Sequence, residues 1–182
     1  KILLDEGYTF KSETDTEIVC NLLSYMYKQH CQEEADSNSS VIEQITCIIG
    51  KTQEMMSGSW GLVIHYRYLP ETLFCVRHGS PLLIGKTDRE IIVASEQSGF
   101  GNRINTYFIL KSNDVCVLNY NSSENELSIR TSQTYTMKQA SKQLIRDSPA
   151  PYPHWTIREI HEQAVSAKNA ISMGGRVLDR TS

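Results

Sequence analysis

From Gly58 onward the sequence consists of short runs rich in β-branched and aromatic residues, separated by turn residues such as Leu69-Pro70-Glu71 and Ser112-Asn113-Asp114. Runs of this composition and length are typical of strands, and the residues between them are typical of turns. We therefore predict seven strands, at 62–68, 72–77, 81–84, 90–95, 106–110, 115–120 and 127–131. Because the connections are short, we expect a meander of mostly antiparallel strands.

Two helices are predicted ahead of the strands, because apolar residues recur there at helical spacing. Each begins with a capping box, a hydroxyl residue followed three positions later by glutamate: Thr14 with Glu17, and Ser40 with Glu43. The polar residues 31–39 between them are expected to form a loop, and the second helix is expected to end near Gly50.

The last part of the chain predicts an extended connector and a third helix. Residues 147–155 contain three prolines, a composition typical of an extended segment. Thr156 and Glu159 would form a further capping box, and Gly174 with Gly175 would end the helix. Helices, then strands, then a helix predict the α+β class, with the elements packed in layers.

Composition restricts the classes of partner. A length of 182 residues fits about one domain, and a formal net charge of −3 without a cluster of Lys or Arg predicts that nucleic acid is not a partner. Since no apolar stretch reaches about 18 residues and the start is acidic, we expect no membrane helix, no signal peptide and a cytoplasmic location. Residue 1 is Lys rather than Met, so we expect the chain to begin partway into a longer polypeptide.

The five cysteines show no C-x-x-C spacing and no association with the five histidines. We expect them to be reduced thiols that mostly pack as small buried hydrophobic residues. The histidines are scattered, so no metal site is predicted. Residues 98–102, Ser-Gly-Phe-Gly-Asn, lack the strand and helix context of a dinucleotide site, and no cofactor is expected.

Three stretches together resemble the glutaminase half of glutamine–fructose-6-phosphate amidotransferase. They are GYTFKSETDTEIV at 7–19, FCVRHGSPLLIG at 74–85 and REIHEQ at 158–163. A fourth, IIVASEQS at 91–98, is similar to a family strand that usually has Asp where Glu96 stands. Relatives of the same fold that make phosphoribosylamine or asparagine are an alternative, although RHGSPLLIG favours the sugar-phosphate enzyme.

This resemblance implies an N-terminal-nucleophile hydrolase fold, a four-layer αββα sandwich of two antiparallel sheets, here incomplete at the N-terminus. Residues 1–146 would be the C-terminal part of a glutaminase domain (glutamine amidotransferase type 2). Residues 147–182 would be a connector and linker helix leading to a sugar-isomerase domain that this chain does not contain. The complete enzyme would be a homo-oligomer that transfers ammonia from glutamine to fructose 6-phosphate. Its product, glucosamine 6-phosphate, would serve UDP-N-acetylglucosamine synthesis.

Asp15 is the residue to which the resemblance assigns a role, as the carboxylate that binds the α-amino group of glutamine. An ammonium needs a charge-assisted acceptor, and unpaired N–H groups in the first helical turn keep an acid there ionised. From the residues alone, the favoured interpretation of Asp15 is a helix-start acid that interacts with the dipole, worth up to about 1 kcal/mol, and the resemblance shifts the preference to substrate binding. In RHGSP, Gly79 suits a tight turn, and Arg77 is a candidate to pair with a carboxylate.

The family uses the thiol of an N-terminal cysteine as its nucleophile and the free α-amine of that residue as the base. Lys1 cannot do this, and no internal cysteine has an adjacent α-amine. We therefore expect no catalytic residue in this chain and no glutaminase activity from the chain alone. The alternative is a catalytically inactive glutaminase-like domain acting as a protein-interaction module, which Glu96 and the divergent segment 98–155 favour.

Overall fold

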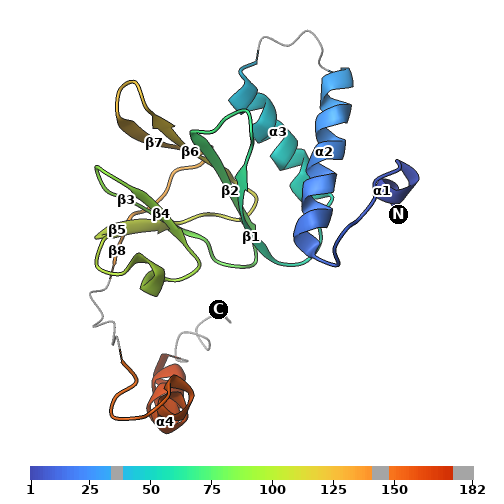
Figure 1. Cartoon of the computed structure of the whole chain (residues 1–182). Helices are drawn as coiled ribbons and strands as arrows, with labels where there is room; N and C mark the ends of the chain where they lie inside the picture. The colour runs from blue at the N-terminus through green and yellow to red at the C-terminus, as the bar shows by residue number, and fades with distance from the viewer. Residues whose placement is uncertain (34–38, 141–147, 174–182) are drawn as a thin grey trace, which may run out of the picture. The chain divides into compact units, whose positions relative to one another are not determined.

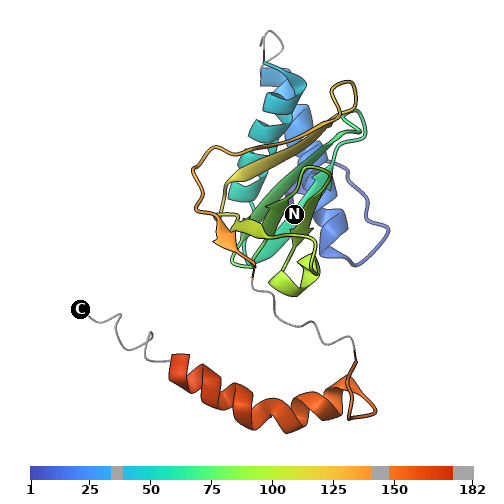
Figure 2. The ribbon, with the colours of Figure 1, turned by 90° about the vertical axis from the view of Figure 1, so that its left-hand side faces the viewer.

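The structure, a computed structural model, describes residues 1–33, 39–140 and 148–173 (Figures 1 and 2). The chain divides into two compact units, Lys1–Lys142 and Gln143–Ser182, each described by itself below. Within the described residues, no helix is both long and apolar enough to span a bilayer.

Three helices precede the strands of the first unit: α1 (Ile2–Asp5), α2 (Asp15–Glu33) and α3 (Val41–Glu54). The predicted capping box of α3 is confirmed, because the Ser40 side chain accepts from the Glu43 N–H and the Glu43 carboxylate accepts from the Ser40 N–H. The predicted end at Gly50 is wrong. Glycine costs a helix only about 1 kcal/mol, and the buried residues Thr52 and Gln53 continue the packed face beyond it.

The predicted loop at 31–39 is wrong at its start, because α2 continues to Glu33. Residues 34–38 of that loop lie outside the described residues. Helix α1 was not predicted, since a single four-residue turn is too short to show helical periodicity.

All seven predicted strands are present, with ends that differ by up to three residues. The strands are β1 (Trp60–His65), β2 (Thr72–His78), β3 (Leu83–Lys86), β4 (Ile91–Ala94), β5 (Thr106–Ile109), β6 (Val115–Asn121), β7 (Glu126–Arg130) and β8 (Lys138–Gln139). The two-residue β8 and the 3₁₀ helix η1 (Gln97–Phe100) were not predicted.

The strands form two four-stranded sheets, in the orders β1-β2-β6-β7 and β4-β3-β5-β8, and every pairing is antiparallel. The predicted α+β class with two antiparallel sheets is confirmed. The predicted meander is wrong where β2 pairs with β6 and β3 pairs with β5 across intervening strands. In the first of these crossovers, Cys75 and Cys116 are register partners.

Strand β2 shows why the first unit is layered. Phe74 and Val76 belong to the same buried cluster as residues of α3, whereas Cys75 belongs to a cluster shared by both sheets. Since successive side chains of a strand point to opposite faces, β2 is buried on both sides. Figure 1 shows α2 and α3 on one face of the β1-β2-β6-β7 sheet and the second sheet on the other face.

The outer face of the second sheet is covered by η1 and the loop after it. Phe100 and Ile104 pack there against Leu83 and Tyr107. Gly85 of β3 permits the close approach, because a Cβ at this position would lie 2.4 Å from Cγ2 of Ile104. Among the described residues of this unit, the three layers are therefore helices, sheet and sheet; the second helical layer implied by the resemblance is not among them.

The second unit contains α4 (Trp155–Met173) and the segment before it. Arg158 is 4% exposed, and its guanidinium donates to the Ser148 carbonyl (2.8 Å) and to the Glu162 carboxylate (2.9 Å). The predicted capping box at Thr156 is wrong, because the helix already begins at Trp155. The predicted stop at 174–175 lies outside the described residues.

Candidate functional site

Asp15, the predicted substrate ligand, is the first residue of α2. The turn before it is ordered by Glu17, whose carboxylate accepts hydrogen bonds from the backbone N–H groups of Lys11 (2.8 Å) and Ser12 (2.7 Å) and from the Ser12 hydroxyl (2.6 Å). These bonds, led by that of the Ser12 hydroxyl, lower the pKa of Glu17. The Glu17 carboxylate thus binds Lys11 and Ser12 instead of the Thr14 N–H. The predicted capping box between Thr14 and Glu17 is therefore wrong.

This arrangement leaves the Asp15 carboxylate exposed to solvent. Within the described residues, Asp15 has neither a hydrogen-bond partner nor an ion-pair partner. Because the hydrogen bonds of the preceding loop go to Glu17, the Asp15 carboxylate is available to accept charge-assisted hydrogen bonds from a cation.

A groove of about 570 Å³ lies beside the start of α2. It is lined by Lys1, Ile2, Leu3, Leu4, Phe10, Ser12, Glu13, Ile18, Leu22 and Met55. Seven of these ten residues are apolar, among them Ile18 of α2, which is 47% exposed, and Leu4 of α1, which is 63% exposed. Glu13 adds one carboxylate to the lining, whereas Asp15 does not line the groove.

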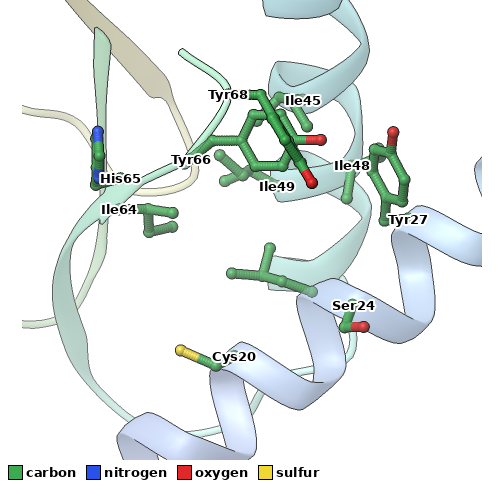
Figure 3. Close-up of a pocket in the computed structure, with 11 residues that line it drawn as sticks. Cys20, Ser24, Tyr27, Ile45, Ile48, Ile49, Ile64, His65, Tyr66 and Tyr68 are labelled. Atoms are coloured by element: carbon green, nitrogen blue, oxygen red, sulfur yellow. The ribbon is translucent and has the colours of Figure 1, made fainter. Parts of the chain in front are cut away.

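A second cavity, of about 380 Å³, lies between α2, α3 and the end of β1 (Figure 3). Five of its eleven lining residues are aliphatic, and three tyrosines lie near one end with Cys20 toward the other. The rings of Tyr66 and Tyr68 are in edge-to-face contact, with their centroids 5.4 Å apart. Hydrogen bonding with the Tyr66 side chain raises the pKa of Tyr27. No local sequence motif indicates this cavity, because its residues come from α2, α3, β1 and the segment after β1.

Arg77 of the RHGSP stretch has a structural position. Its guanidinium donates to the carbonyls of Gly79 (3.2 Å) and Ser80 (2.9 Å) and to the Ser112 hydroxyl (3.2 Å). The expected pairing with a carboxylate is therefore wrong. Gly79 has φ of 70°, and a Cβ there would lie 2.5 Å from Oγ of Ser59, so the turn requires glycine.

The cysteines divide into two groups. Cys75 and Cys116 are buried between the sheets, and burial raises the pKa of Cys75 to about 12 and also raises that of Cys116. Cys20, Cys31 and Cys47 are exposed, so the prediction of mostly buried thiols is wrong. Within the part of the chain that the structure describes, no group of three His, Cys, Asp or Glu residues is placed to hold a metal ion.

Comparison with known proteins identifies relatives over nearly the whole chain, although no protein-family model matches it. The probable glutamine–fructose-6-phosphate aminotransferase (isomerizing) of Acanthamoeba polyphaga mimivirus is 32% identical over 176 residues, which is 96% of this chain and 26% of the relative. The enzyme of the same name from Buchnera aphidicola is 31% identical over 171 residues, 93% of this chain and 26% of the relative. That from Thermococcus kodakarensis is 28% identical over 192 residues, 98% of this chain and 28% of the relative.

The chain spans about a quarter of the length of these curated relatives. The matches confirm the resemblance that the three motifs carry. Over nearly its whole length, this chain is homologous to one region of the glutamine–fructose-6-phosphate aminotransferases.

Proposed function

We propose that this chain is part of an isomerising glutamine–fructose-6-phosphate transaminase, which hydrolyses glutamine and transfers the ammonia to fructose 6-phosphate. The glucosamine 6-phosphate formed would feed UDP-N-acetylglucosamine synthesis. Support comes from the names of the relatives and from their similarity to 89–98% of this chain. The described region would contribute to the glutaminase half of the complete protein.

In this proposal, Asp15 binds the α-ammonium group of glutamine. The observation that supports it most directly is that the two acids in the first turn of α2 have different surroundings. Glu17 accepts the hydrogen bonds of the preceding loop, and Asp15 is left exposed. A free carboxylate at this position can accept up to three N–H bonds of an ammonium group.

The nucleophile in this proposal comes from outside the 182 residues. Buried thiols are poor nucleophiles because burial disfavours the thiolate, which applies to Cys75 and Cys116. The exposed thiols of Cys20, Cys31 and Cys47 lie within helices, where none has a free α-amine beside it. We therefore expect the isolated chain to release no ammonia from glutamine.

The test is the Asp15→Asn substitution in the complete protein. Loss of a hydrogen bond to a charged group costs about 1.5–3 kcal/mol, so the KM for glutamine should rise roughly ten- to a hundredfold. The KM for fructose 6-phosphate should not change. Glu13→Gln is the matched control, because Glu13 is an exposed acid two residues away. An unchanged glutamine KM in Asp15→Asn, or an equal rise in Glu13→Gln, would contradict the assignment.

The alternative function is a catalytically inactive glutaminase-like domain that binds a partner protein. The apolar groove formed by α1 and α2 favours it, because exposed Ile2, Leu4 and Ile18 are costly in water unless another surface covers them. Steady-state assays of the complete protein separate the two functions. Glutamine-dependent formation of glucosamine 6-phosphate supports the enzyme, and its absence in folded protein supports the interaction module.

A further inference from the structure

A third cavity, of about 320 Å³, lies where α3 ends and the first sheet begins. It is lined by Gly50, Gln53, Glu54, Met56, Ser57, Gly58, Trp60, His78 and Asn113. The residues come from the end of α3, the segment that leads to β1, the start of β1, the end of β2 and the loop before β6. The cavity is distinct from the region around Asp15, and the proposed function assigns it no role.

Two side chains in this lining, Gln53 and Trp60, have buried polar atoms without a hydrogen-bond partner among the described residues. Gln53 is 7% exposed, and within the described residues neither its amide oxygen nor its amide nitrogen has a hydrogen-bond partner. The indole Nε1 of Trp60 is also buried and, within the same residues, without an acceptor. An unsatisfied buried polar group is costly, so native proteins seldom keep one without a reason. Both residues that carry these three atoms line the same cavity.

The wall beside these groups is built from aromatic rings. Trp60 and His78 are stacked, with ring centroids 5.0 Å apart and planes at 26°. Nδ1 of His78 lies 3.1 Å from Oδ1 of Asn113, which fixes the orientation of the imidazole. Since the indole ring is held by its neighbour, its N–H direction is defined before any ligand arrives.

We propose that this cavity binds a small neutral molecule through a carboxamide group. The carbonyl of such a ligand can accept hydrogen bonds from the Trp60 indole N–H and from the Gln53 side-chain N–H. An N–H of the same ligand can donate to the Gln53 amide oxygen, so one amide group satisfies both side chains.

Charged ligands fit this lining less well. A carboxylate would leave the Gln53 oxygen without a donor and would lie near the carboxylate of Glu54, which also lines the cavity. An ammonium group only donates, so it would leave the N–H groups of Trp60 and Gln53 without acceptors. The volume is near the lower limit of small-molecule sites, which are about 300–1,000 Å³.

The test compares three probes of similar size: propionamide, propionate and propylammonium. The readout is the indole N–H resonance of Trp60 in ¹⁵N-labelled full chain. The chain has two tryptophans, so Trp155→Phe assigns the signal. Propionamide should shift this resonance saturably, and the other two probes should not. Gln53→Leu should weaken propionamide binding about tenfold or more, because it removes both hydrogen bonds of the side chain.

Gln44→Leu is the matched control, since Gln44 lies on the same helix and its amide donates to the Ser39 carbonyl. It should bind propionamide as the unsubstituted chain does. If Gln53→Leu does not fold, Trp60→Phe retains a ring and removes the indole N–H, and binding is then followed by the backbone amide of Gly58. The proposal is overturned if propionamide gives no saturable shift, if propionate matches it, or if the folded variants bind it as the unsubstituted chain does. None of these results depends on glutaminase activity.

Discussion

Substitution of Gly85 by Ala tests whether the second sheet depends on close contact with the loop after η1. Gly85 lies in β3, and a Cβ there would be 2.4 Å from Cγ2, 3.1 Å from Cγ1 and 3.3 Å from Cβ of Ile104. Ile104 is 3% exposed and packs with Phe100, Leu83 and Tyr107. The added methyl group therefore cannot be accommodated unless Ile104 moves within a packed cluster.

Inserting a methyl group into a packed core costs about 1–3 kcal/mol in the free energy of unfolding. The 2.4 Å contact indicates the upper part of this range, because heavy atoms in contact normally lie about 3.5–4 Å apart. Ile104→Ala alone should cost about 2–5 kcal/mol, since it opens a cavity. In the double variant the new methyl group at 85 occupies part of that cavity. The combined cost should therefore be less than the sum by about 1–3 kcal/mol.

The assay is urea unfolding of the full chain at constant pH, followed by tryptophan fluorescence in a Trp155→Phe background so that Trp60 reports on the first unit. Gly50→Ala is the matched control. It is also a glycine-to-alanine change, but a Cβ at Gly50 has nothing within 4 Å, and α3 should gain about 0.5–1 kcal/mol.

Two results would refute this reasoning. One is a Gly85→Ala variant whose stability lies within about 0.5 kcal/mol of the parent, the range of an ordinary surface substitution. The other is a double variant whose cost equals the sum of the single costs, which would show that the two residues do not compete for the same space.

Two further predictions concern buried titratable groups. Stability should fall as pH rises above about 8.5, where unfolded thiols ionise, and continue falling toward pH 12, because buried Cys75 has a pKa of about 12 and stays protonated in the folded chain. Urea midpoints between pH 7 and pH 10 measure this, and a Cys75→Ala variant with an equally steep decline would contradict it. Tyr135→Phe should cost about 1–3 kcal/mol, because the Tyr135 hydroxyl donates to the carboxylate of Asp114, which is 2% exposed. Thermal unfolding against the control Tyr68→Phe, a 68% exposed tyrosine, tests it, and equal midpoints would count against it.

Local patterns were sufficient to predict most elements of the first unit. The strands are visible in the sequence as runs of β-branched and aromatic residues bounded by turn residues. The Ser40 capping box is visible because both of its residues lie within one turn of the chain. Elements without a period were missed. Strand β8 has two exposed residues, Lys138 and Gln139, and is defined only by its pairing with β5.

The pairing order could not be predicted, because a strand's sequence does not state its partner. Residues 72–78 fit equally well beside the next strand in the chain as beside β6, with which they actually pair. The choice of β6 as partner depends on the burial of both faces of β2, which favours a central position in the sheet.

The residues of the candidate sites differ in how far the sequence alone predicts them. Asp15 was proposed through family resemblance, and its exposed position at the start of α2 leaves its role a proposal. Gln53 carried no signal in the sequence, because a glutamine near the end of a helix is normally solvated. Only the assembly of α3, β1 and β2 buries it beside Trp60.

The central place of β2 has a consequence for how the chain folds. Neighbouring hairpins such as β1 with β2 and β6 with β7 close short loops, but the β2–β6 ladder joins Val76 to Val115 and Thr72 to Asn119. Closing such distant segments loses more chain entropy before the contacts form, which slows folding. During synthesis, Phe74 and its neighbours must therefore wait for residues 115–121 to emerge, and a chain arrested earlier would carry an open apolar strand prone to aggregation.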